Sequence, residues 1–190
     1  MKPALFLDRD GVINHDFGYV HQQSNFKFIT GIFELVRTAN ELGLLCIIVT
    51  NQAGIGRGYY TENDFLNLTE WMLAEFEKNG ARVDAVYHCP FHPTEGLGNY
   101  KKFSLDRKPG PGMLLRAALD FDINLSASTM IGDKLSDMQA ARSAGVKTRI
   151  LFTDGQKSAI NTDELTSCTQ VDSHAEAMQI LQKFHCINER

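Results

Sequence analysis

The sequence predicts an α/β fold, a Rossmann-like three-layer sandwich around a central, mainly parallel β-sheet. Two observations carry this prediction. Short apolar runs with the composition of buried strands alternate along the chain with amphipathic segments of helical periodicity. The helical segments also carry capping signals at their ends. Such alternation is typical of a parallel sheet covered by helices, and it continues without a linker, so residues 1–190 are expected to form a single domain.

The strands are predicted first, because they set the frame of the fold. Each is a short apolar run of the kind that forms a buried strand. The predicted strands are residues 4–7, 44–49, 85–87, 129–131, 148–152 and, more weakly, 169–171.

The helices are predicted from apolar residues that recur at helical spacing between these strands. The first runs over about residues 32–42, and the second carries an apolar stripe from Phe65 to Phe76. End signals define the others. These signals are Thr61 with Asp64 for the second helix, Pro111 in the first turn of the third, Ser136 and Gly145 for the fourth, and Ser173 with Glu176 for the last.

Composition excludes several classes of function. The 190 residues are 43% apolar and 22% charged, as in an ordinary globular protein, and the net charge is −4. Lys and Arg form no dense block, so a nucleic-acid partner is not expected. The longest apolar run, residues 42–49, is far shorter than the roughly 20 residues that span a bilayer, so no membrane partner is expected either.

The four cysteines are widely scattered, which fits neither a secreted disulfide framework nor a close-spaced redox motif. We therefore expect reduced thiols. No signal peptide or membrane anchor is visible in the sequence, so a cytoplasmic protein is expected. Two stretches, residues 11–30 and 89–109, fit no helix or strand, and loops of this length in a compact domain are usually functional.

Charged and hydrogen-bonding residues gather where the predicted strands end. Asp8 and Asp10 follow the first strand, and Asp133 follows the fourth. In open parallel sheets ligands bind beyond the carboxyl ends of the strands, so these carboxylates should meet there. Their mutual repulsion calls for a cation, and oxygen ligands without nearby Cys or His favour Mg²⁺.

A phosphoryl group in transfer needs fixed donors around its oxygens, and Thr50 and Lys108 are suited to this task. Arg107 can bind a second phosphate or a sugar oxygen bidentately. Taken singly, each residue could equally belong to a turn, a helix cap or a solvated surface. Taken together, matching phosphate chemistry at four strand ends predicts a phosphatase.

At these residues the chain resembles the haloacid dehalogenase superfamily of phosphotransferases. The resemblance implies an aspartyl-phosphate intermediate at Asp8, general acid/base catalysis by Asp10, and phosphate contacts from Thr50 and Lys108. It also implies Mg²⁺ held by Asp8, the Asp10 carbonyl and Asp133. The matching motifs are Phe6-Leu7-Asp8-Arg9-Asp10-Gly11, Val49-Thr50-Asn51, Lys108 and Ile131-Gly132-Asp133-Lys134-Leu135-Ser136-Asp137.

Within that superfamily the chain is most similar to the D-glycero-D-manno-heptose 1,7-bisphosphate 7-phosphatases and the related histidinol-phosphatase domains, over about residues 4–155. The resemblance implies a protein without a cap domain that removes the 7-phosphate in the synthesis of nucleotide-activated heptose. We expect a monomer. Histidinol-phosphate phosphatase and a non-catalytic phosphate-binding module remain as alternatives. The implied substrate contacts are Asp16, Gly18, Tyr19, Asn51, Gln52, Arg107 and Lys134.

The chain departs from this family in one respect. Members commonly hold a structural Zn²⁺ in the second loop through Cys-x-His and Cys-x-Cys. Here Cys89 is kept, but Phe91, Ser104 and Asp106 stand at the other three ligand positions. Tetrahedral structural zinc needs four such donors, so no zinc is predicted. Apolar packing of Phe91, Tyr100 and Phe103 is expected to order the loop instead.

Overall fold

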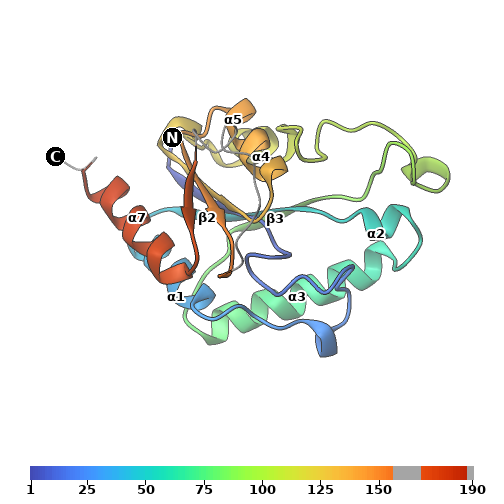
Figure 1. The fold of residues 1–190 in the computed structure, drawn as a ribbon, viewed down its shortest axis with the longest axis horizontal. Helices are drawn as coiled ribbons and strands as arrows, with labels where there is room; N and C mark the ends of the chain where they lie inside the picture. Colours follow the sequence, from blue (N-terminus) through green and yellow to red (C-terminus); the bar gives the residue numbers. More distant parts are fainter. Residues whose placement is uncertain (156–167, 188–190) are drawn as a thin grey trace.

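The computed structural model describes residues 1–155 and 168–187, and within them six parallel strands form one sheet in the order β3-β2-β1-β4-β5-β6 (Figure 1). The α/β prediction is confirmed. The strands are β1 Ala4–Leu7, β2 Leu45–Asn51, β3 Ala85–Cys89, β4 Thr129–Gly132, β5 Thr148–Phe152 and β6 Thr169–Val171. The helices are α1 Ile32–Glu41, α2 Ala53–Gly56, α3 Glu62–Lys78, α4 Gly112–Phe121, α5 Leu135–Ala144 and α7 His174–Ile187, with short 3-10 turns at Gln23–Asn25, Gly98–Tyr100 and Leu125–Ala127.

Side chains that alternate along the strands form a core on each face of the sheet. Leu5 and Leu7 of β1 pack into one apolar cluster with residues of α1, α3 and α7. Ala4 and Phe6 pack into the other, with residues of α4 and α5. In Figure 1, α4 and α5 lie on one side of the sheet and α1 and α3 on the other, which gives the three expected layers.

Three strands extend further than predicted, including β4, which continues to Gly132 and pairs there with Leu151 of β5. β2 continues through Thr50 and Asn51, and β3 continues to Cys89, because these residues pair with each other as Thr50 with His88 and Asn51 with Cys89. Polar residues at a strand end gave no apolar signal to extend the prediction. Thr50 is therefore held rigidly by the sheet rather than by a loop.

The end signals were right for some helices and wrong for others. Thr61 caps α3 as predicted: its Oγ1 accepts from the Asp64 N–H at 3.1 Å, and the Asp64 carboxylate accepts from the Thr61 N–H at 2.8 Å. Gly145 ends α5 at φ +90°. Ser136, however, is not a cap but lies inside α5, and Lys134 occupies the N-cap position, where its N–H donates to Asp137 at 3.0 Å.

Smaller differences concern the other helices. Pro111 is the N-cap of α4 rather than part of its first turn. The hydroxyl of Ser173 accepts from the Glu176 N–H at 3.3 Å, as predicted, but the Glu176 carboxylate accepts from Asp172. The four-residue helix α2 was missed, since it is too short to show a periodicity. Within residues 1–155 and 168–187, no helix has the length and apolarity needed to span a bilayer.

Candidate active site

The order in which strands are added to the sheet reverses next to β1, which pairs with β2 on one side and with β4 on the other. From β1 the chain builds outward to β3, and from β4 it builds outward to β6, so the loops leaving β1 and β4 diverge. A pocket of about 370 Å³ lies at this point. Its lining includes every predicted catalytic and substrate-binding residue, namely Asp8, Asp10, Asp16, Gly18, Tyr19, Thr50, Asn51, Gln52, Arg107, Lys108 and Lys134.

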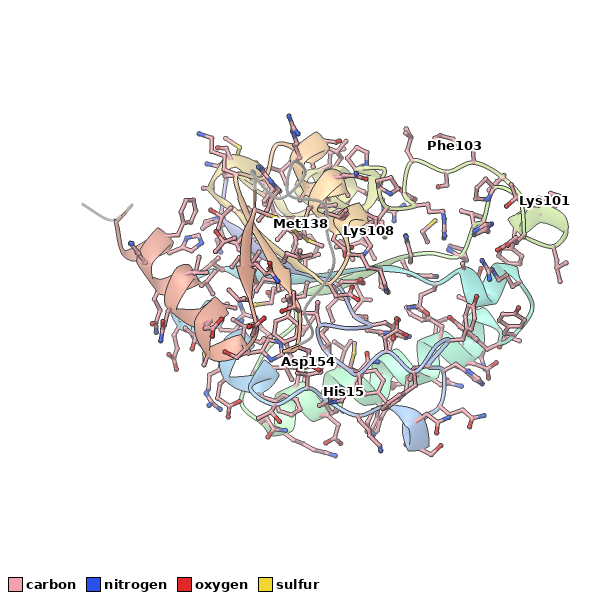
Figure 2. The ribbon with its side chains drawn as sticks, in the orientation of Figure 1. His15, Lys101, Phe103, Lys108, Met138 and Asp154 are labelled. Carbon is pink, nitrogen blue, oxygen red and sulfur yellow. The ribbon has the colours of Figure 1, made fainter. Side chains whose placement is uncertain are left out.

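Lys108, labelled near the middle of the view in Figure 2, is buried and joins the strand ends. Its Nζ lies 2.8 Å from Asp8 and 2.6 Å from Asp137, and it donates to the Val49 carbonyl at 2.9 Å. All three charged side chains are almost fully buried. Sequence reasoning placed Asp137 at this edge without assigning it a role. Its signal was a carboxylate in the first turn of the helix that follows Asp133.

The contacts among these charged groups shift the pKa values of Asp8 and Lys108. Burial raises the pKa of Asp8, and repulsion by Asp137 adds to this, whereas the Lys108 charge lowers it. Burial lowers the pKa of Lys108, but Asp137 and Asp8 outweigh burial and raise it overall. Lys108 is thus a permanent cation that holds the attacking oxygen of Asp8 in place.

Asp8, Asp133 and Asp137 present carboxylate oxygens that all lie within 4.8 Å of one another. Among the described residues, Asp133 Oδ1 is buried without a hydrogen-bond partner. Burial, and then repulsion by Asp8, raises the pKa of Asp133 to about 7. A hard divalent cation such as Mg²⁺ fits this set, because it takes carboxylate oxygens and offsets their repulsion. The part of the Asp10 carbonyl in such a site stays a prediction.

Gly11 makes room for Asp133. A Cβ on Gly11 would lie 2.3 Å from Asp133 Oδ2, and the residue has a φ of +92°. Gly11→Ala is therefore expected to displace the Asp133 carboxylate and to raise the Mg²⁺ concentration for half-maximal activity at least about tenfold, as for loss of a charged contact. Titrating activity with Mg²⁺ measures this.

The matched control for this substitution is Gly43→Ala. Gly43 also has a positive φ, +74°, but a Cβ there would meet nothing within 4 Å. Both variants place a Cβ on a residue with positive φ, so an equal change in Mg²⁺ dependence would contradict the proposed contact.

Protons should compete with Mg²⁺ at this site, because Asp133 has a pKa of about 7 without metal and must lose its proton to bind one. The Kd for Mg²⁺ is expected to rise about tenfold for each pH unit below 7, and to level off above pH 8. Calorimetric titrations between pH 5.5 and 8.5 test this. A Kd independent of pH would show that Asp133 is not a ligand.

Asp10 is fixed by three neighbours. Arg9, which is 1% exposed, binds its carboxylate through two nitrogens at 2.9–3.2 Å, and Asn14 donates to it at 3.0 Å. Gln52 donates to it at 3.1 Å. Arg9 and Asn14 were not predicted as site residues, because the sequence does not show that these two polar side chains are buried. Together these donors hold the carboxylate in the pocket beside Asp8.

Gln52 links Asp10 to Thr50. Its Nε2 also donates to Thr50 Oγ1 at 2.8 Å, while its Oε1 accepts from the Tyr60 hydroxyl at 2.5 Å. Burial raises the pKa of Tyr60 to about 12, so this hydroxyl keeps its proton and fixes the amide orientation. Because Thr50 Oγ1 is an acceptor here, its own O–H remains available for a phosphate oxygen.

The outer end of the pocket brings together the first long loop and the start of α5. Lys134 Nζ lies 3.2 Å from Asp16 and 3.3 Å from Asp133. Burial lowers the pKa of Lys134, but these carboxylates and Asp8 raise it overall. Gly18 donates its N–H to Asp16 at 3.0 Å, and its φ of +77° turns the chain so that Tyr19 faces the pocket.

Asn51 and Arg107 also line the pocket, but each has a contact within the protein. The Asn51 amide binds the Lys108 peptide with two hydrogen bonds of 3.0 Å. Arg107 donates to the Phe91 carbonyl at 3.3 Å. Direct contact of either with substrate stays a prediction.

The 89–109 loop is ordered by several contacts. Phe91 lies 6.1 Å from the ring of Tyr100 and 4.0 Å from the ammonium of Lys102. The prediction for Phe103 was wrong: it is 78% exposed and lies at the outer edge of the molecule (Figure 2). The loop is also joined to α2, because the Leu97 N–H donates to the Gly56 carbonyl at 2.7 Å.

The residues at the family's zinc positions have other partners. The Cys89 side chain is fully buried in the apolar cluster beneath α4 and α5, and Asp106 binds Arg116 at 2.8 Å. Within residues 1–155 and 168–187, the set Asp8, Asp133 and Asp137 is the only group of three His, Cys, Asp or Glu side chains placed for a metal.

The fold and this site define a phosphatase of the haloacid dehalogenase-like class. A family model described as "HAD-hyrolase-like" matches residues 105–177. The chain is 56% identical over 159 residues to the D-glycero-alpha-D-manno-heptose-1,7-bisphosphate 7-phosphatase of Burkholderia mallei, with 84% of each chain covered. It is 49% identical over 155 residues to the D-glycero-beta-D-manno-heptose-1,7-bisphosphate 7-phosphatase of Vibrio cholerae, with 82% of this chain and 83% of the relative covered.

A solved structure agrees with these relatives. The D,D-heptose 1,7-bisphosphate phosphatase from B. bronchiseptica, complexed with magnesium and phosphate, has a TM-score of 0.80 and 27% identity, and covers 96% of this chain and 99% of that one. The chain belongs to the family of D-glycero-D-manno-heptose-1,7-bisphosphate 7-phosphatases. The resemblance predicted from the motifs is confirmed.

Proposed function

We propose that the protein hydrolyses the 7-phosphate of a D-glycero-D-manno-heptose 1,7-bisphosphate, with Asp8 as nucleophile and Asp10 as general acid and base. The observation that carries this proposal is the convergence of Asp8, Asp10, Thr50 and Lys108 in one pocket. Asp8 and Asp137, which line this pocket, lie close enough to Asp133 for the three carboxylates to hold a divalent cation. The names of its relatives supply the substrate.

In the first step an Asp8 oxygen attacks phosphorus, and the bond from phosphorus to the sugar oxygen breaks. Asp10 gives its proton to that leaving oxygen. In the second step water attacks the phosphorus of the aspartyl phosphate, gives a proton to Asp10, and releases inorganic phosphate and the Asp8 carboxylate. Lys108 and the free O–H of Thr50 bind the phosphoryl oxygens, whose charge they stabilise.

Asp8, Asp133 and Asp137 would hold Mg²⁺, which when bound supplies positive charge beside the phosphoryl oxygens. Asp16, Tyr19, Gln52, Arg107 and Lys134 line the remaining pocket and are proposed to contact the sugar and its second phosphate. We further propose a cytoplasmic monomer with a single domain over residues 1–190.

The test is phosphate release with magnesium from three compounds: the alpha and beta anomers of the heptose 1,7-bisphosphate, and histidinol phosphate. The two relatives described above are named for opposite anomers, so both are measured. The proposal requires one anomer to have the highest kcat/KM. A higher kcat/KM for histidinol phosphate would replace the proposed substrate.

We also propose that the loop holds no structural zinc. Metal analysis of purified protein is expected to find much less than one equivalent of zinc, and a chelator selective for zinc should leave the melting temperature unchanged. Stoichiometric zinc that is lost together with thermal stability would contradict this.

A further inference from the structure

One cation that lines the pocket has no part in the reaction just described. Arg57, in the turn after α2, lines the pocket together with Arg107. Its guanidinium donates to the Tyr19 hydroxyl and pairs with Glu95 of the second loop, and His92 lies 3.4 Å away. Arg57 Nε is buried and has no hydrogen-bond partner among the described residues.

A sugar bisphosphate brings two phosphates into this pocket. With the reacting phosphate against Asp8 and Lys108, the second must be met by other cations in the lining. Those cations are Arg57, Arg107 and Lys134. Lys134 is already shared between two carboxylates, Asp16 and Asp133.

Each of the two arginines has fewer carboxylate partners than Lys134. Arg107 has a carbonyl partner at 3.3 Å, and Arg57 pairs with Glu95, a side chain that is 55% exposed and free to turn into solvent. Burial lowers the pKa of Arg107, and the nearby Arg57 charge lowers it further, so the two guanidinium groups repel each other. A dianionic phosphate between them would relieve this repulsion and could be bound bidentately.

We propose that Arg57 binds the second phosphate of the substrate together with Arg107, and that Glu95 occupies Arg57 until that phosphate displaces it. This inference rests on the proposed function and adds a specificity-determining residue to it. The position of Arg57 does not depend on Glu95 alone, because its N–H donates to the Ala53 carbonyl at 2.9 Å and its guanidinium lies 5.6 Å from the Tyr19 ring.

The experiment compares a heptose 1,7-bisphosphate with the heptose 7-phosphate that lacks the second phosphate. Arg57→Gln is expected to raise KM for the bisphosphate about tenfold to a hundredfold, the range for loss of a charge-assisted hydrogen bond, with kcat little changed. Its kinetics on the monophosphate should stay within about twofold of the wild type, because that compound lacks the phosphate that Arg57 would bind and the ion pair lost with Glu95 is partly exposed.

Glu95→Gln provides a second variant that does not remove the arginine. It is expected to lower KM for the bisphosphate about twofold to fivefold, since a competing exposed charge is removed. Arg37→Gln is the matched control, because Arg37 pairs with Glu34 on α1 and lies outside the pocket lining.

Equal losses on both compounds in Arg57→Gln would overturn the inference and make Arg57 a structural contact of the loop. An unchanged or higher KM for the bisphosphate in Glu95→Gln would also overturn it. A wild type that hydrolyses the monophosphate but not the bisphosphate would overturn the proposed function itself, and the inference with it.

Discussion

Asp8→Asn is expected to lower phosphate release by a factor on the order of 10⁵, as when a covalent nucleophile is removed. The fold should survive. In the wild type, Asp8 Oδ1 lies 2.8 Å from Lys108 Nζ and accepts from the Arg9 N–H at 2.7 Å. The side-chain oxygen of Asn can accept both hydrogen bonds. The substitution also removes one of three clustered negative charges.

Steady-state phosphate release measures the loss of turnover, and a thermal melt without magnesium shows whether the fold is kept. Asp120→Asn is the control, because the Asp120 carboxylate also accepts a hydrogen bond, from the Tyr87 hydroxyl, but lies outside the pocket lining. If Asp8→Asn kept more than about a hundredth of wild-type turnover, nucleophilic catalysis by Asp8 would be ruled out.

Lys108→Met is expected to abolish turnover and also to lower the free energy of unfolding by about 3–5 kcal/mol at pH 8, the range for breaking a buried ion pair. The substitution leaves Asp8 and Asp137 without the cation that lies 2.6–2.8 Å from both. The loss should shrink towards pH 5. Unpaired buried carboxylates have raised pKa values in the folded state, so folding gains stability as they take up protons.

Urea denaturation at both pH values measures this loss, and a double variant identifies its cause. Lys108→Met combined with Asp137→Asn is expected to recover much of the stability without activity, because one buried negative charge is then gone. Lys134→Met is the matched control: its side chain is 55% exposed, so a much smaller change is expected. An equal loss in both lysine variants would argue against a special role for the buried pair.

The sequence predicted the sheet and most of the pocket because their signals are local. Apolar runs identified the six strands, and the motifs at their ends identified Asp8, Thr50, Lys108 and Asp133. The topology then brings these ends together, as the rule for parallel sheets requires.

What the sequence did not predict depends on contacts between distant segments. Arg9 is a charged residue that is almost completely buried, and its fixation of Asp10 cannot be read from its neighbours in the chain. Tyr60 reaches Gln52 only because Gly54 is small: a Cβ there would lie 2.2 Å from the Tyr60 ring. Asp137 was visible in the motif, but its bond to Lys108 was not.

Both ends of the second loop, residues 89–109, are bound to one residue of β2, Asn51. The loop departs where Cys89 pairs with Asn51 at the edge of the sheet, and it ends where the Asn51 amide binds the peptide of Lys108. Insertions, deletions or exchanged side chains between these two points therefore need not move the catalytic lysine. Such an arrangement makes the loop a replaceable part, in which metal ligands can be lost and substrate preference altered while the reaction centre keeps its geometry.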